Sequence, residues 1–451
     1  MSTLQQNGLA IGRRRWLRSA AVASKPRAGT AFFFLCAFFV VYCIRPEDWI
    51  PGLKLIPLAK LSAGGALIAL LAGAGSLQKK LQGLPREAKF LFAMILLLFL
   101  SAFLSPVWKG GAVGHTIDFA KVIVVFVLLF VLVTDIEKLR RIIFVQSASV
   151  VVLTAISLIK GHDRPRLEGV IGGIYSNPND LAFAIVLCIP FCLAFLVTSK
   201  NVLWKLLWAS GILVMLVALF LTASRAGFID LIISGTVCLW HFGVRGKRYY
   251  LIVITALLGT VLMVSAGKKL VQRFEAISEQ GEGDSAHGSY EARKYLMLKA
   301  IEGIEHYPIL GIGANNFTNY SGIWHEVHMT YLEIAVEGGI PSLILYLLFF
   351  GCGFRNLRLL RKRKNLPLEY QVFAGAMHAS LIGFVVGALF GPEAYHLFPY
   401  FAVAYTSVLL ALVNRMDDSA VPEAVTRPVH RRRMRIYGAD GKRQPPVTVP
   451  R

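Results

Sequence analysis

Apolar runs of about twenty residues recur along most of the chain, and each is long enough to cross a bilayer as an α-helix. Hydrophobic residues make up 55% of the 451 residues, and charged residues only 16%. The sequence therefore predicts an all-α, polytopic membrane protein with about twelve transmembrane helices within residues 30–416. The expected spans are 30–44, 56–75, 90–107, 117–134, 142–160, 180–198, 203–222, 226–242, 249–267, 329–353, 371–391 and 396–413.

Basic residues gather on one side of this expected topology. With the N-terminus placed in the cytoplasm, the inner segments hold 33 of the 48 Lys and Arg residues, as the positive-inside rule requires. Topology and contact with anionic membrane lipids then explain the net charge of +22 without nucleic acid as a partner. We expect both termini in the cytoplasm, with a basic N-terminal segment 1–29 and a disordered basic tail 417–451. The run "RRR" ahead of the first apolar stretch resembles an export signal, but no small-residue cleavage site follows, so we predict a retained first helix.

One long polar segment, 268–328, is expected on the outer side, between the ninth and tenth spans. Within it, "SYEARKYLMLKAIEGIEH" predicts a short helix that is capped by Ser289 and ends before Pro308. Leu298, Ile301 and Ile304 recur along one side of this helix. We expect them to dock it on the membrane face or on the helix bundle.

Arginines on the outer side require an explanation, because the positive-inside rule makes them scarce there. Arg225 interrupts the apolar stretch "LFLTASRAGFIDLIISG" at an outer turn, and Arg293 lies near the start of the outer helix. A guanidinium binds phosphate bidentately and keeps its charge at any working pH, so both suit a pyrophosphate at a membrane surface. The alternatives are a snorkelling side chain for Arg225 and a solvated helix charge for Arg293. Arg164 and Arg166, in "GHDRPRLEG", are expected to be ordinary loop residues.

His328 lies where the outer segment enters the tenth span, one helical turn after His325. A neutral imidazole there could accept a proton from a sugar hydroxyl at neutral pH. The alternatives are a metal site of the type His-x-x-His, for which the sequence offers no third ligand, and a hydrogen-bonded interfacial histidine. All six cysteines lie in apolar spans and no nucleotide-binding or metal-binding motif is present, so we expect no metal and no cofactor.

Four stretches of the sequence occur in a characteristic order: "IYSNPNDLAFAIVLCIPFCLAF", "LTASRAGFIDLIISG", "YEARKYLMLKAIEGIEHYPILGIGANNF" and "HMTYLEIAVEGGIPSLILYL". Over roughly residues 165–350 they resemble the sequence blocks of the O-antigen ligase and polymerase family of bacterial envelope glycosyltransferases. The resemblance implies a metal-independent, inverting enzyme of the bacterial inner membrane. Such an enzyme transfers a glycan from an undecaprenyl diphosphate carrier to an acceptor hydroxyl, on lipid A core or on another glycan.

The resemblance also implies roles for individual residues. Arg225 and Arg293 would bind the diphosphate and stabilise it as it leaves, and His328 would activate the acceptor as the catalytic base. Asn179 and Ser224 would support the site as polar neighbours. Met329 departs from the pattern of many relatives, which have Asn or Ser after the histidine, so the polar support of His328 is expected to differ.

Two other functions compete with a ligase. A polymerase of the same family would use the same donor with a different acceptor. A transporter or flippase of lipid-linked sugars would need charged residues deep within the spans and broken helices in corresponding halves. The sequence shows few interior charges and no internal repeat, which favours chemistry at the outer surface; Lys121, near the start of the fourth span, is left unexplained.

Overall fold

Each predicted apolar span coincides with a helix in the computed structural model, which describes residues 25–50, 52–72, 83–160, 166–169, 175, 177–275, 285–323, 325–363 and 365–420. The prediction of an all-helical protein is confirmed for these residues. The helices that coincide with the predicted spans are α2 (Lys25–Ile44), α4 (Leu58–Ala72), α6 (Arg86–Phe103), α7 (Lys109–Leu132), α8 (Ile136–Lys160), α9 (Pro178–Thr198), α10 (Val202–Thr222), α11 (Arg225–Cys238) with its π-helical continuation η3 (Leu239–Val244), α12 (Tyr250–Glu275), α15 (Thr330–Arg361), α16 (Leu368–Gly387) and α17 (Phe398–Ala420). Shorter helices lie between them: α3 (Pro46–Trp49), η1 (Leu53–Leu55), α13 (Ser285–His306) and α14 (Phe317–Ser321).

Seven of these helices are long and apolar enough to cross a membrane, namely α7, α8, α9, α10, α11 together with η3, α15 and α16. Helices α2, α4 and α12 contain shorter apolar stretches. The chain is therefore a multi-pass membrane protein. The count of twelve spans and the outer location of segment 268–328 stay predictions.

The boundaries of two helices differ from the predicted ones. Helix α12 continues to Glu275, so it extends into the segment predicted to be the outer loop. Helix α17 continues to Ala420, so residues 417–420 are helical rather than disordered. The rest of the predicted tail, and residues 1–24 of the basic N-terminal segment, lie outside the described residues. Residues Met1–Leu412 form one compact unit and Val413–Arg451 a second, and the site described below lies in the first.

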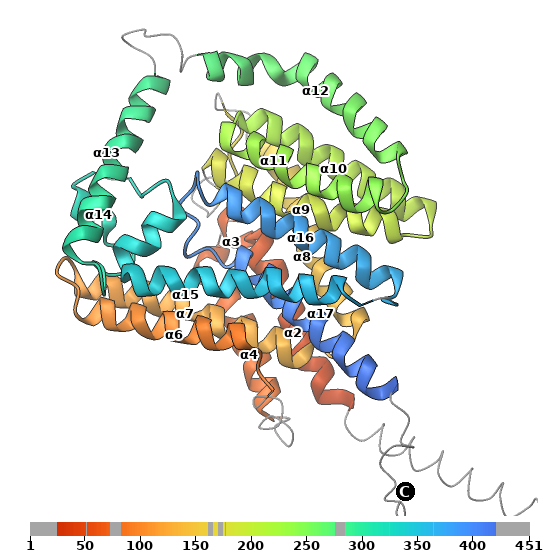
Figure 1. The fold of residues 1–451 in the computed structure, drawn as a ribbon, viewed down its shortest axis with the longest axis horizontal. Helices are drawn as coiled ribbons and strands as arrows, with labels where there is room; N and C mark the ends of the chain where they lie inside the picture. Colours follow the sequence, from red (N-terminus) through yellow and green to blue (C-terminus); the bar gives the residue numbers. More distant parts are fainter. Residues whose placement is uncertain are drawn as a thin grey trace, which may run out of the picture. The chain divides into compact units, whose positions relative to one another are not determined.

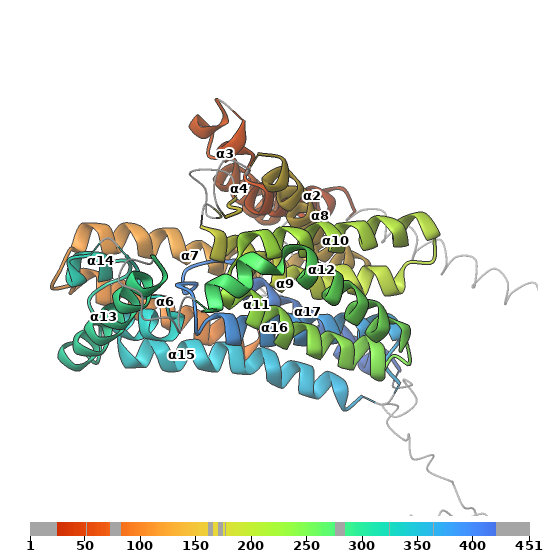
Figure 2. The same ribbon diagram turned by 90° about the horizontal axis from the view of Figure 1, so that it is seen from above.

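Helix α9 occupies the middle of one group of helices, where it packs against α8, α10, α11 and α16 (Figure 1). Helix α15 packs along α6, which in turn packs on α7. Helices α2, α4 and α8 form a further group, which Figure 2 shows at the top of the view. The starts of α9, α11 and α15, which carry the predicted site residues, are thus held by helices that are far apart in sequence.

Helix α15 bends at Gly339, which has a left-handed backbone (φ 78°), two residues before Pro341. Pro341 has no N–H, so it cannot donate to the carbonyl of Glu337 within the helix. That carbonyl accepts instead from the N–H of Gly313 (2.9 Å) and from the hydroxyl of Ser101 (2.8 Å). The bend thereby bonds the segment before α14 to the first part of α15.

The carboxylate of Glu337 fixes the same segment a second time. One oxygen accepts the backbone N–H of Asn315 (2.7 Å) and the other that of Phe317 (3.3 Å). The N–H of Ile312 is donated to the carbonyl of Val336 (2.9 Å). Backbone groups that a broken helix would leave unsatisfied therefore hold residues 312–317 in place.

The outer helix α13 packs on this segment through an apolar cluster. Leu296 and Ala300 of α13 are buried together with Phe317, Val327 and Val336. Positions 296 and 300 are four residues apart, which places them on one face of the helix. This cluster attaches α13 to the start of α15.

The predicted docking face of α13 is therefore only partly correct. Ile304 packs against the cluster, but Leu298 and Ile301 are 55% and 39% exposed. Position 298 lies about 200° around the helix from position 296, so the two cannot face the same neighbour. The helix also begins at Ser285, so Ser289 lies inside it and is not its N-cap, whereas its predicted end before Pro308 is confirmed.

Buried carboxylates occur in the helices more often than the sequence analysis expected. Glu87, Asp230, Glu333 and Glu337 are all buried, and each lies within the first two turns of its helix or, for Glu337, just before the bend. Glu87 accepts hydrogen bonds from Asn356 of α15 (2.7 Å) and from the hydroxyl of Ser407 of α17, so it joins the start of α6 to two other helices. These acids therefore stand near helix ends or breaks.

Lys121, which the sequence left unexplained, forms an ion pair with Asp118 on the preceding turn of α7.

Candidate active site at the start of α15

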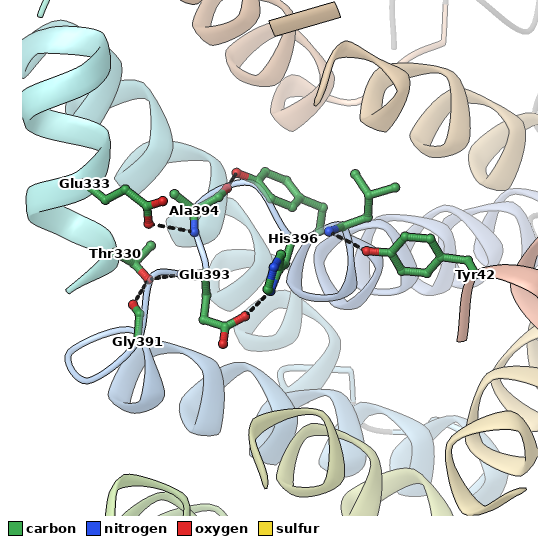
Figure 3. Close-up of polar contacts among 9 residues, drawn as sticks. Tyr42, Thr330, Glu333, Gly391, Glu393, Ala394 and His396 are labelled. Atoms are coloured by element: carbon green, nitrogen blue, oxygen red, sulfur yellow. Dashed lines mark hydrogen bonds and ion pairs between the residues drawn. The ribbon is translucent and has the colours of Figure 1, made fainter. Parts of the chain in front are cut away.

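Thr330, the first residue of α15, ties the start of this helix to the loop between α16 and α17. Its backbone N–H is donated to the carbonyl of Ala388 (2.9 Å). Its hydroxyl donates to the carbonyl of Gly391 (2.7 Å) and accepts the N–H of Glu393 (2.9 Å), as Figure 3 shows. His328 lies two residues before this anchor, so its backbone is fixed relative to the loop.

Arg293 and His328, both predicted site residues, are brought together. The docking of α13 through Leu296 and Ala300 onto Val327 places Arg293 close enough to act on the imidazole. Burial, followed by the positive charges of Arg293 and His325, lowers the pKa of His328 to about 4. The imidazole is therefore neutral at pH 7 and able to accept a proton.

Ser224 and Asn179, the predicted supporting residues, contact each other directly. Ser224 is the N-cap of α11: its hydroxyl accepts the N–H of Gly227 (3.1 Å) and donates to the side-chain oxygen of Asn179 (2.7 Å). Asn179 lies in the first turn of α9, so this bond joins the starts of α9 and α11. Arg225 is the first residue of α11, where the N–H groups of the helix end favour a bound anion.

Arg166 belongs to this network, and the prediction that it is an ordinary loop residue is wrong. Its guanidinium donates to the side-chain oxygen of Asn179 (3.2 Å) and to the carbonyl of Thr222 (2.9 Å). It thus holds the loop before α9 against the turn that carries Arg225. Arg164 lies outside the described residues.

A pair that the sequence analysis did not consider, Glu393 and His396, lies in the loop between α16 and α17 (Figure 3). Nδ1 of His396 donates to a carboxylate oxygen of Glu393 at 2.5 Å. Burial opposes a charge on this imidazole, but Glu393, Asp180 and Glu326 outweigh it and raise the pKa of His396 to about 9. His396 is therefore an imidazolium at neutral pH. The only signal in the sequence is an acid and a histidine three residues apart in "GPEAYHLFPY", directly after an apolar span.

The carboxylates that act on His396 come from two parts of the site, the start of α9 and the segment before α15. Asp180 directly follows Asn179 at the start of α9, and Glu326 lies two residues before His328. Both carboxylates act on His396, so the start of α9 and the segment that carries His328 face the same loop. The meeting of Arg225 with Arg293 and His328 in one pocket stays a prediction.

The alternative of a metal site at His325 and His328 finds no further ligand. In the described ranges, no three His, Cys, Asp or Glu side chains are grouped so that they could hold a metal ion. His325 is exposed, whereas His328 is half-buried. The two histidines therefore lie in different environments.

Residues 210–347 match a family described as O-antigen ligase, and they include α11, Arg293 and His328. The match confirms the stated resemblance over these residues, and the block that contains Asn179 lies outside it. No curated protein matches the chain.

Proposed function

Because residues 210–347 match the O-antigen ligase family, we propose that the chain is a membrane glycosyltransferase of the ligase type. It transfers a glycan from an undecaprenyl diphosphate carrier to an acceptor hydroxyl, on lipid A core or another glycan, at the outer face of the bacterial inner membrane. Both termini lie in the cytoplasm in this proposal. The observation that carries it is the packing of α13 on the start of α15, which brings the charge of Arg293 near enough to lower the pKa of His328.

The proposed chemistry is a single displacement at the anomeric carbon of the donor sugar. The acceptor hydroxyl oxygen bonds to this carbon while its proton passes to the neutral imidazole of His328. The bond between the carbon and the diphosphate oxygen breaks, and its electron pair leaves with the diphosphate. Arg225 and Arg293 stabilise the growing negative charge, so no metal is required, and the displacement inverts the carbon.

Asn179 and Ser224 act as positioning residues in this mechanism. Ser224 caps α11 and bonds to Asn179, and it directly precedes Arg225 in the chain. A fixed start of α11 limits the positions that the guanidinium of Arg225 can adopt. This restriction of Arg225 matters because displacement requires the leaving group to be held in line with the attacking oxygen.

The test uses the full chain in vesicles that contain an undecaprenyl diphosphate glycan, with lipid A core as acceptor. We expect transfer to fall by roughly 100-fold or more in His328→Ala, with donor binding retained. Arg225→Ala and Arg293→Ala should lose both transfer and donor binding. Lys294→Ala, which removes the exposed cation next to Arg293 on α13, is the matched control and should transfer normally.

Each outcome of this assay has a defined meaning. Normal transfer in His328→Ala would exclude it as the base, and normal transfer in either arginine variant would exclude that arginine from the diphosphate site. Transfer to a second donor molecule, with none to lipid A core, would establish a polymerase instead of a ligase. Movement of the intact donor across the bilayer without a covalent product would establish a transporter and overturn the proposal.

A further inference from the structure

A cavity of about 580 Å³ lies at the opposite end of α15 from His328. It is enclosed by the turn after η3, by the last turns of α15 and by the start of α16, which Figure 1 shows beside the end of α15. The 32 residues of α15 span roughly 45 Å, so this cavity lies far from the candidate active site. In the proposed topology it opens at the cytoplasmic surface of the membrane.

The lining of the cavity is strongly basic. Among the residues that the structure describes, six cationic side chains and no Asp or Glu line it: Arg245, Lys247, Arg248, Arg358, Arg361 and Arg363. The two arginines in the last turn of α15 also complement the partial negative charge of that helix end. This effect does not explain the three cations on the facing turn, which belong to another helix.

The facing turn is built so that its three cations lie close together. Helix η3 has π-helical hydrogen bonds, and the N–H of Arg245 is donated to the carbonyl of Trp240 (2.9 Å). The N–H of Arg248 is donated to the carbonyl of Gly243 (2.7 Å), and Lys247 between them has a left-handed backbone (φ 53°). Non-glycine residues rarely adopt this backbone conformation, and π-helical turns are frequent at functional sites.

The remaining lining is largely apolar and aromatic, and its polar side chains are Gln371 and one histidine pair. Phe242, Phe354 and Leu357 contribute to the walls. His241 and His378, which also line the cavity, are hydrogen-bonded to each other between Nε2 and Nδ1 (3.0 Å). A ligand that fits such walls carries negative charge at one end and hydrocarbon at the other.

We propose that this cavity binds the phosphate headgroup of an anionic membrane lipid, with the acyl chains along its apolar wall. Guanidinium groups bind phosphate oxygens bidentately, and basic pockets between helices at the cytoplasmic surface suit phospholipid headgroups. Inorganic pyrophosphate offers the same phosphate chemistry without hydrocarbon. Lipid is favoured because the aromatic and aliphatic side chains would gain nothing from a fully hydrated anion.

The experiment measures lipid binding to the purified full chain by native mass spectrometry and by thermal unfolding. The probes are cardiolipin, phosphatidylglycerol, phosphatidylcholine and inorganic pyrophosphate. We expect the chain to bind the two anionic lipids at least tenfold more tightly than phosphatidylcholine. The double variant Arg358→Gln/Arg361→Gln should weaken this binding roughly tenfold.

The matched control is Arg355→Gln/Lys362→Gln, which removes two exposed cations from the same end of α15 that do not line the cavity. It should bind anionic lipid within about twofold of the unaltered chain if the cavity is the site. A second cavity variant, Arg245→Gln/Arg248→Gln, changes exposed or half-buried side chains on the facing turn and should reproduce the loss.

Three results would overturn the proposal. These are equal losses in cavity and control variants, equal binding of phosphatidylcholine, and binding of pyrophosphate that excludes lipid. Because glycan transfer is not the readout, the result is independent of the proposed reaction at the other end of α15.

Discussion

The hydroxyl of Thr330 accepts the backbone N–H of Glu393 at 2.9 Å and donates to the carbonyl of Gly391 at 2.7 Å. His328 lies two residues before Thr330, and His396 lies three residues after Glu393. One buried hydroxyl therefore holds together two segments that are more than sixty residues apart in the sequence and that each carry a histidine. The position of the proposed catalytic base, His328, depends on these two hydrogen bonds.

These two hydrogen bonds can be removed with little change in side-chain volume. Thr330→Val removes the hydroxyl, and leaves the N–H of Glu393 and the carbonyl of Gly391 without their partner. We expect the free energy of unfolding to fall by about 2 kcal/mol, because each buried unsatisfied group costs on the order of 1–3 kcal/mol. Transfer should fall by roughly 100-fold, because small misplacements of a catalytic group have effects of this size.

Chemical unfolding and the vesicle transfer assay measure these two effects. Thr330→Ser keeps the hydroxyl and should retain both stability and transfer. A Thr330→Val protein that is as stable and active as the unaltered chain would show that the hydrogen bonds of the Thr330 hydroxyl do not position His328.

The charge of Arg293 should control the titration of His328. Burial, followed by Arg293 and His325, lowers the pKa of His328 to about 4 in the unliganded chain. The acid limb of kcat/KM reports the free enzyme, so we expect a limb near pH 4 from this group. In Arg293→Gln one cation is lost, so the limb should move to higher pH.

The comparison needs a variant in which the cation remains. Arg293→Lys keeps a positive charge near the imidazole, and its limb should stay close to that of the unaltered chain. A limb that fails to rise in Arg293→Gln would contradict the electrostatic contact. A diphosphate bound to Arg293 cancels the same charge, so the limb of kcat, which reports the complex, should lie at higher pH than that of kcat/KM.

The sequence predicts the helices and the pair Arg293 and His328 for different reasons. Apolar runs of about twenty residues leave few alternatives to membrane helices, because the bilayer cannot satisfy irregular backbone. Arg293 and His328 follow from the resemblance to a family, not from their spacing. The prediction of Asn179 and Ser224 as supporting residues follows from the resemblance too. In the structure these two residues are hydrogen-bonded to each other (2.7 Å).

The charge of His396 and the buried face of α13 depend on tertiary contacts, which no local sequence pattern predicts. The raised pKa of His396 comes first from Glu393, three residues earlier in the same loop, and then from Asp180 and Glu326, which belong to distant segments. The predicted buried face of α13 is partly wrong because apolar residues occur on more than one side of this helix. Packing against the cluster that contains Phe317, Val327 and Val336 selects the side of Leu296 and Ala300.

His396 should make stability depend on pH above neutrality. Its pKa is raised from 6.5 to about 9 in the folded chain, so folding stabilises the imidazolium. The contribution is fully present below pH 6.5, and is lost as the pH rises through about 9. The midpoint of thermal unfolding should therefore fall over this range by more than in the variant His396→Gln, in which residue 396 no longer titrates.

Glu393→Gln tests the cause of this shift. The amide keeps the shape of the side chain but removes the negative charge, so the pKa of His396 should fall toward its ordinary value. The pH dependence between 6.5 and 9 should then shrink. An unchanged dependence in Glu393→Gln would mean that other groups produce it.

The bend of α15 provides the last prediction. Gly339 has φ 78° and ψ 169°, a conformation that is essentially restricted to glycine. A Cβ at this position would lie 2.2 Å from the carbonyl oxygen of Ile309. Gly339→Ala should therefore destabilise the fold by at least about 2 kcal/mol, and should release the segment that Glu337 holds.

Gly351→Ala, on the same helix, is the control, because a Cβ there meets nothing within 4 Å. It should be neutral, or should stabilise the helix by up to about 1 kcal/mol. Chemical unfolding measures the difference between the two variants, and proteolysis of residues 309–317 measures the release of the segment. Equal stability of the two variants would mean that α15 can straighten, and that the segment before α14 does not need the bend to stay docked.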